Sequence, residues 1–297
     1  MQNTKDDISR ITETVSLCRR VANTIRKCMK CETDRITKKA DVLKRGFRER
    51  KFEDLNKLTS SMLEVDFHNF NTCCAYMVTY AACYSELTYI AAAILQNTTN
   101  ELHEIIDKQS LLTITSINGG PGNDLLGFLY SLCGKYSNLI KLNLNIIDSN
   151  IQWQVFFSTL MSEVEANGNC NKLGKFISEI KLSHKFVHGD ATHGRRFGEV
   201  KETLENSDLV LMVQTLSLMT MGKKIDLLRE VLDLMKRNAI ILIVDSEWPS
   251  LVAGYTQGHY EVILNMKDLV ACTKPSTVYN CQNITVCVAD AIALKKL

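Results

Sequence analysis

The chain has 297 residues, of which 45% are hydrophobic and 23% charged, with only three prolines. This composition is typical of a globular protein and excludes a long disordered or collagen-like chain. The formal net charge is +2, yet residues 1–51 hold 15 Lys and Arg against 7 Asp and Glu, so the positive charge is concentrated in this first segment.

The basic N-terminal region permits two interpretations. A positive arm on a near-neutral body is a candidate surface for RNA or another polyanion. The alternative is a solvated helix with mixed charges, which the alternation in Arg48, Glu49, Arg50 and Lys51 favours. Both interpretations stay open at this stage.

Cysteine usage predicts the compartment. Eleven cysteines are an odd number, and the polar segment Met1–Arg10 is no apolar signal peptide. Reduced thiols in the cytoplasm or the nucleus are therefore expected. The spacing of Cys28 and Cys31 could suggest zinc, but a second well-spaced pair is missing, so no metal site is expected.

The first part of the chain has a helical pattern up to about residue 109. Apolar residues from Ile8 to Met29 recur at steps of three and four, which forms one apolar helix face. Further helices are expected over about Asp34–Phe47 and from Phe52 to Leu63. We place a boundary near Lys108, which gives a helical domain at 1–109 and a second domain at 110–297.

The apolar stretch Cys73–Leu95 requires comparison with a membrane span. It contains Glu86 and four tyrosines, and a central acid costs about 2.5–3.5 kcal/mol in hydrocarbon. A helix or helix pair buried in a soluble domain is therefore predicted, and no membrane contact.

From Leu111 onward, β-rich runs alternate with helical stretches, which indicates a parallel sheet covered on both faces. The strands are expected at Thr113–Ile117, Leu142–Ile147, Lys185–His188, Leu209–Val213 and Asn238–Val244. The helices are expected near Asn123–Lys135, Ile151–Glu165, Arg195–Glu205 and Lys223–Lys236. Gly168–Gly174 is expected to be a polar loop, and Asn145 suggests that the second strand lies at an edge. Two last strands, Tyr260–Met266 and Ile284–Ala289, lack a helix between them and should pair antiparallel.

A glycine-rich turn, Asn118–Asn123, joins the first strand of this region to a helix. Such a corner binds phosphates or nucleotides in doubly wound folds. A triphosphate site needs Lys and Ser or Thr where the chain has Asn123 and Asp124, and a dinucleotide site needs glycine where it has Leu125. The loop therefore suits an adenosine-bearing ligand without a pyrophosphate.

The Gly-Gly-Pro-Gly sequence and the Leu-rich helix after it resemble motif I of the class I S-adenosylmethionine-dependent methyltransferases, over roughly Leu111–Leu297. The resemblance implies S-adenosylmethionine as cofactor and a Rossmann-like sheet of seven strands in the order 3-2-1-4-5-7-6, with the last strand antiparallel. It also implies that Asp148 contacts the ribose hydroxyls and that Asp190 contacts the adenine amine. Either carboxylate could instead cap the segment that follows it.

Ligands in open α/β sheets bind at the carboxyl ends of the strands, which defines the candidate site. The residues expected to contact the cofactor are Asn118, Gly119, Gly120, Pro121, Gly122, Asp148, Ser149, Asp190, Ala191 and Gln214. The candidates for the chemistry of transfer are Gln214, Ser217, His188 and His193. Trp153 is expected to pack on its helix, and Trp248 is a candidate wall of the substrate site.

The leading functional hypothesis is an active methyltransferase with RNA as acceptor. The segment Gly122–Phe128 also resembles a eukaryotic group that includes fungal ribosomal-RNA uridine methyltransferases.

Ser116 stands where the family usually has an acid and Asn118 replaces the first loop glycine. These departures motivate the alternative of an inactive methyltransferase-fold protein that serves as a binding or scaffolding subunit for a protein partner. A nicotinamide oxidoreductase is disfavoured by Leu125 and by the terminal hairpin.

Overall fold

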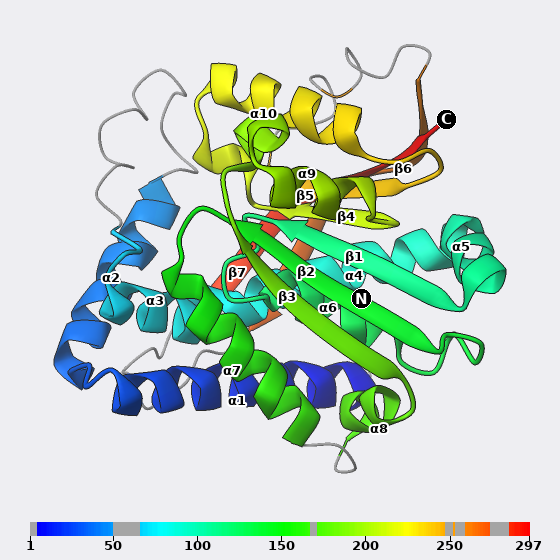
Figure 1. Ribbon diagram of the computed structural model, residues 1–297. Coiled ribbons are helices and arrows are strands. Elements are labelled where there is room, and N and C mark those ends of the chain that lie inside the picture. Colours follow the sequence, from blue (N-terminus) through cyan, green and yellow to red (C-terminus); the bar gives the residue numbers. More distant parts are fainter. Residues whose placement is uncertain (1–4, 50–65, 167–170, 247–251, 253–258, 274–284) are drawn as a thin grey trace.

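The computed structural model describes residues 5–49, 66–166, 171–246, 252, 259–273 and 285–297 (Figure 1). Their strands form one seven-stranded sheet in the order β3-β2-β1-β4-β5-β7-β6. The first five strands are parallel, and β7 runs antiparallel to both β5 and β6. This confirms the predicted sheet. The strands are β1 (Leu111–Ile117), β2 (Lys141–Asp148), β3 (Lys181–His188), β4 (Leu209–Val213), β5 (Ile240–Asp245), β6 (Tyr260–Thr273) and β7 (Thr285–Lys296).

Helices cover both faces of the sheet, so β4 and β5 are buried along their full length. One face packs against α6 (Asn123–Leu132), α7 (Gln152–Ala166) and α8 (Lys172–Ser178). The other face packs against α9 (Gly198–Glu205) and α10 (Met221–Leu234). Two short 3-10 segments, η3 (Ala191–Arg196) and η4 (Leu216–Leu218), follow β3 and β4.

The N-terminal helices lie on the face that carries α6 and α7, and their apolar residues join those of the sheet in one hydrophobic cluster. The closest approach is at Gly127 of α6, where a Cβ would lie 2.0 Å from the Ser85 carbonyl oxygen. Glycine at this position therefore allows the two helices to touch. The N-terminal elements are α1 (Lys5–Cys28), α2 (Thr33–Glu49), α3 (Phe70–Tyr76), the π-helical turn η2 (Met77–Ala81), α4 (Ala82–Thr98) and α5 (Glu101–Gln109).

The apolar stretch in the middle of this region forms one continuous helix over Phe70–Thr98. It is long and apolar enough to cross a membrane, but 78% of its most apolar window is buried inside the fold. Tyr80 and Tyr84 are buried, Tyr76 is partly buried, and the three rings contact one another. The helix is therefore a core helix of this fold, as the sequence predicted.

Several local predictions need correction. Asn145 is not on an edge strand, because β2 pairs with both β1 and β3, and its Nδ2 donates to Thr115 Oγ1 at 3.3 Å. Part of the expected polar loop at 168–174 is helical, because Asn171 caps α8 by accepting from Gly174 N at 2.7 Å. The helix expected over Arg195–Glu205 is divided at Phe197, whose backbone is extended. β6 and β7 are longer than predicted, and the helix expected from Phe52 to Leu63 lies outside the described residues.

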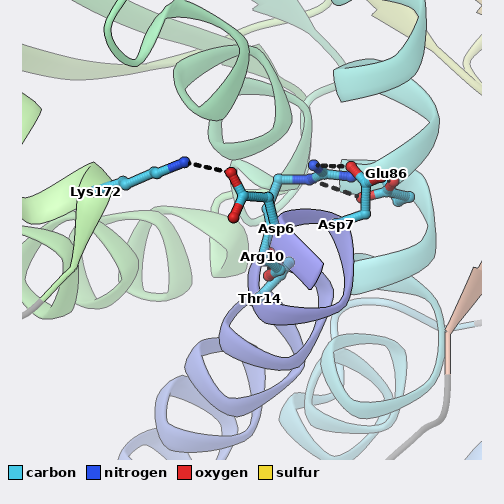
Figure 2. Close-up of polar contacts among 6 residues, drawn as sticks. All are labelled: Asp6, Asp7, Arg10, Thr14, Glu86 and Lys172. Carbon is cyan, nitrogen blue, oxygen red and sulfur yellow. Dashed lines mark hydrogen bonds and ion pairs between the residues drawn. The ribbon is translucent and has the colours of Figure 1, made fainter. Parts of the chain in front are cut away.

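Helix α1 is fixed to the rest of the fold by charged side chains (Figure 2). Arg10 Nη2 lies 2.6 Å from Glu86 Oε1 of α4, and both side chains are only 10% exposed. The guanidinium carbon also lies 3.4 Å from the centre of the Tyr89 ring, within the range of a cation–π contact. A second ion pair, between Lys172 Nζ and Asp6 at 2.8 Å, is exposed to solvent.

Candidate functional site

The turn after β1 uses the left-handed backbone region three times. Asn118 has φ +50°, Gly120 φ +53° and Gly122 φ +92°. Asn enters this region more readily than other residues with a Cβ, because its short polar side chain can bond locally. Asn118 N also donates to Ile147 O at 2.7 Å, which ties the turn to the end of β2. The replacement of the first loop glycine by Asn is thus compatible with the geometry of the turn.

The glycines of this turn are required by packing within the protein. A Cβ on Gly119 would lie 2.5 Å from Ser116 Oγ, and one on Gly122 would lie 2.6 Å from Phe157 Cδ2. A Cβ on Gly120 would lie 3.8 Å from the indole ring of Trp153. Protein atoms therefore lie on the side of the loop where a Cβ of Gly119 or Gly122 would be.

Asp148, at the end of β2, is directly joined to the glycine turn. Its carboxylate accepts from Gly120 N at 3.0 Å and from Asn150 N at 2.8 Å. The side chain is buried, and burial raises the pKa of Asp148 to about 6, although the hydrogen bonds from Asn150 and Gly120 act in the opposite direction. A carboxylate has more acceptor positions than these two bonds use.

A second buried acid, Asp124, lies in the first turn of α6 and was assigned no role from the sequence. Ser116 Oγ of β1 donates to Asp124 Oδ2 at 3.0 Å, and Asn123 Nδ2 donates to Oδ1 at 2.6 Å. Tyr76 of α3 reaches the same place, with its hydroxyl 3.4 Å from Asn123 Oδ1. Burial, with a smaller contribution from nearby Asp148, raises the pKa of Asp124 to about 8. The sequence contained one indication of Asp124: Ser116 stands where the family usually has an acid, so an acid had to be sought elsewhere near the turn.

The loop after β4 is fixed between β1 and β5. Gln214 has φ +51°, and Thr215 Oγ1 donates to Ile117 O at 3.1 Å. Asp245, at the end of β5, accepts from Leu216 N at 2.7 Å and from Ser217 N at 3.1 Å. Gln214 Nε2 is buried without an acceptor among the described residues. Gln214 and Ser217 therefore lie on a loop that is held next to the end of β1, as the topology predicted.

The structure places the predicted site residues at and after the end of β3 in different surroundings. His188 is exposed, and its Nε2 lies 2.9 Å from Ser149 O, so it is beside the end of β2. Asp190 Oδ1 accepts from Thr192 N at 2.9 Å, which is the capping role considered as its alternative. His193 Nδ1 lies 3.6 Å from Asp190 Oδ2, and Ala191, the first residue of η3, is buried.

Two arginines, Arg195 and Arg196, end the 3-10 segment η3. Arg195 pairs with Glu230 and Asp233 of α10. Arg196 is exposed.

Aromatic side chains from the N-terminal region cover the turn. The Phe67 ring lies 5.4 Å from the Trp153 ring and 5.9 Å from the Tyr76 ring. Asn150 Nδ2 donates to Phe67 O at 2.7 Å, which links this cover to the Asp148 loop. Trp153 thus packs as expected but against the turn as well as its own helix, and Trp248 lies outside the described residues.

Among solved structures, the chain is similar to several methyltransferases. The chain is similar to a protein of Listeria monocytogenes described as a "putative class i s-adenosylmethionine-dependent methyltransferase", with 10% identity, coverage of 97% of this chain and 88% of the other, and a TM-score of 0.44. It is similar to the magnesium protoporphyrin IX methyltransferase of Synechocystis, solved with bound cofactor, with 7% identity, 69% and 80% coverage and a TM-score of 0.40. It is also similar to TrmN from Thermus thermophilus, with 15% identity, 70% and 52% coverage and a TM-score of 0.37.

No curated protein matches the sequence. Residues 26–258, more than half of the chain, match a family model described as "Putative SAM-dependent methyltransferase". The chain therefore belongs to this family of S-adenosylmethionine-dependent methyltransferases.

Proposed function

We propose that the protein transfers a methyl group from S-adenosylmethionine to RNA. The observation that carries the proposal is a pair of buried carboxyl groups, Asp148 and Asp124, beside the glycine turn at the carboxyl edge of the sheet. Neither has a lysine or arginine partner at ion-pair distance among the residues that the structure describes. Buried acids without cations fit a ligand that is itself cationic and rich in hydroxyl groups.

These residues fit S-adenosylmethionine. Asp148 has free acceptor positions for the ribose hydroxyls, next to the Asn118–Gly122 turn. Ser149 follows Asp148 in the chain and contacts His188 at the end of the neighbouring strand β3. Asp190 and Ala191 come directly after that strand. When bound, the cofactor would supply a methyl group made electrophilic by its sulfonium.

The contribution of the chain is to orient the acceptor and to accept a proton. Methyl transfer is an in-line displacement, so positioning supplies much of the rate. The unpartnered Nε2 of Gln214 is available to donate to an acceptor oxygen or ring nitrogen, and Ser217 lies on the same fixed loop. His188 presents Nε2 to a carbonyl oxygen, which leaves Nδ1 as the nitrogen that can take a proton. His193 is the second candidate base.

The basic N-terminal region supports RNA as the acceptor. Lys27, Lys30 and Lys38 are exposed and have no ion-pair partner at 4 Å or less among the described residues. We call these three lysines the basic patch. They lie on α1, the turn after it and α2, and Figure 1 shows α2 on the side of the sheet toward which β1 points. Phosphate contacts of this kind supply much of the affinity for nucleic acids.

The segment Gly122–Phe128 resembles a group that includes fungal ribosomal-RNA uridine methyltransferases, which leads us to propose a uridine of ribosomal RNA as the methyl acceptor. We propose the cytoplasm or the nucleus as the compartment. The nine cysteines within the described residues form no disulfide bond, which is consistent with a reducing environment.

The competing function is a scaffolding subunit without catalysis. Ser116 and Asn118 differ from the family pattern at the turn. Protein side chains also lie close to where a Cβ on each of its glycines would be. A subunit of this kind would bind a protein partner and would not need the cofactor.

Calorimetry with S-adenosylhomocysteine, followed by transfer of labelled methyl to total RNA, tests the proposal. We expect micromolar binding, and the variant Asp148→Ala should weaken it by more than about tenfold, since a charge-assisted hydrogen bond to the ribose is lost. Label should enter RNA in the presence of S-adenosylmethionine and not in the variant. Absence of binding at high micromolar ligand would favour the scaffold, and an unchanged affinity of Asp148→Ala would refute the ribose contact.

A further inference from the structure

We infer that Asp124 binds the ammonium group of the cofactor's amino-acid part, so that helix α6 supplies the carboxylate that the family places on β1. This inference rests on the proposed function, because it concerns the same cofactor. It also predicts a selectivity for adenosyl ligands that carry an amino acid over those that lack it.

The geometry supports a relocation of the acid. Position 116 carries a serine, and its hydroxyl donates directly to Asp124 Oδ2 at 3.0 Å. The carboxylate therefore lies one hydrogen bond from the strand position where an acid is missing.

Among the described residues, no cation pairs with the carboxyl group of Asp124. The side chain is 3% exposed, and its hydrogen-bond donors, Ser116 and Asn123, are both neutral. The nearest charged group that affects it is another acid, Asp148. Burial of an ionised carboxylate without a cation is costly, and an ammonium group from a ligand would remove that cost.

The location of Asp124 also connects the cofactor site to the N-terminal helices. Tyr76 of α3 is partly buried, and its hydroxyl lies 3.4 Å from Asn123 Oδ1, while Asn123 Nδ2 donates to Asp124. Movement of α3 would therefore change the hydrogen bonds around the carboxylate.

The test compares two ligands on three proteins by calorimetry. S-adenosylhomocysteine carries the ammonium group, and 5′-methylthioadenosine lacks the amino acid entirely. For Asp124→Asn, we expect S-adenosylhomocysteine to bind about thirtyfold more weakly, as for loss of a charged hydrogen bond, and 5′-methylthioadenosine to bind within about threefold of the wild type. Asp148→Asn is the matched control, since the ribose is common to both ligands, and it should weaken both alike.

Each outcome has a distinct meaning. If the wild type binds neither ligand, the proposed function fails. If the wild type binds both and Asp124→Asn retains its preference for S-adenosylhomocysteine, the inference about Asp124 is overturned while the proposed function stands.

Thermal unfolding without ligand shows whether Asp124→Asn is folded. If it is not, the exchange variant Ser116→Asp with Asp124→Ser keeps one carboxyl in the same contact. We expect the exchange variant to retain the preference for S-adenosylhomocysteine. Loss of that preference in a folded exchange variant would count against the inference.

Discussion

Asp124 shows how one buried acid affects both ligand binding and stability. In the folded protein without ligand, burial holds its pKa at about 8, far above the ordinary 3.8, and Ser116 is the largest opposing influence. Asp148 and Tyr76 also face this place, and burial raises the pKa of each of them. At neutral pH the folded state therefore retains a proton that the unfolded chain has lost.

The sign of the resulting pH dependence follows from linkage. Between pH 3.8 and about 8 the folded state binds one more proton at Asp124 than the unfolded state does, so stability falls as the pH rises through this window. Asp148 has the same effect only up to about pH 6. The interval from pH 6.5 to 8 therefore isolates Asp124 from the other acid.

We predict that urea unfolding of the wild type loses about 1.5 kcal/mol between pH 6.5 and 8 relative to Asp124→Asn, at 1.36 kcal/mol for each unit of pH. Because the histidines are common to both proteins, the difference between the two curves removes their contribution. Parallel curves for the two proteins would show that Asp124 is ionised in the folded state over this range.

At the scale of elements, α1 is stabilised by its contact with α4. Arg10 bonds with both Glu86 and Asp7 and lies over the Tyr89 ring. Removal of one partner of a buried ion pair leaves the other charge uncompensated, whereas replacement of both by apolar residues is often neutral. The pair therefore predicts strong coupling between these two positions.

We expect Glu86→Gln to lower the free energy of unfolding by about 2–3 kcal/mol, a value below the usual range for fully buried pairs because both side chains retain some exposure. The double variant Arg10→Met with Glu86→Leu should recover most of this loss. Lys172→Ala, which breaks the exposed pair with Asp6, is the control and should leave unfolding unchanged. Chemical denaturation measures all three, and an equal effect of Lys172→Ala and Glu86→Gln would contradict the buried role.

For the whole molecule, the sequence pattern predicted a parallel sheet with an antiparallel end, and the family resemblance predicted the strand order. The alternation of runs from Thr113 to Val244 has one simple solution in a parallel sheet, and the missing helix before the last strand requires antiparallel pairing. Asn145 was misinterpreted because a polar residue in a strand suggests an edge, whereas its partner Thr115 is provided by a neighbouring strand that is distant in sequence.

The candidate site was predictable where a residue follows a strand directly. Asp148 and Gln214 are of this kind, since chain direction alone places them at the carboxyl edge. Asp124 and Asp245 were assigned no role, because their importance depends on contacts with Ser116 and with the loop after β4. Such contacts depend on tertiary packing. The boundary near Lys108 predicts two domains. Helices on both sides of it contribute buried residues to one hydrophobic cluster.

The distribution of charge over the whole molecule gives the last prediction, which concerns RNA. Lys30 and Lys38 of the basic patch are exposed and unpaired within the described residues, so their charge is available for phosphates. We expect the variant Lys30→Glu with Lys38→Glu to bind RNA at least about tenfold more weakly at physiological salt. Two fewer phosphate contacts should also reduce the slope of log affinity against log salt by about 1–2.

The matched control for this experiment is Lys175→Glu with Lys267→Glu, which changes the net charge equally at exposed lysines on α8 and β6. Fluorescence anisotropy with a labelled RNA at several salt concentrations measures both variants. Binding of S-adenosylhomocysteine should be unchanged in both, because neither pair is among the residues proposed to contact the cofactor. If the two variants weaken RNA binding alike, overall charge explains the affinity; if neither does, RNA contacts another surface.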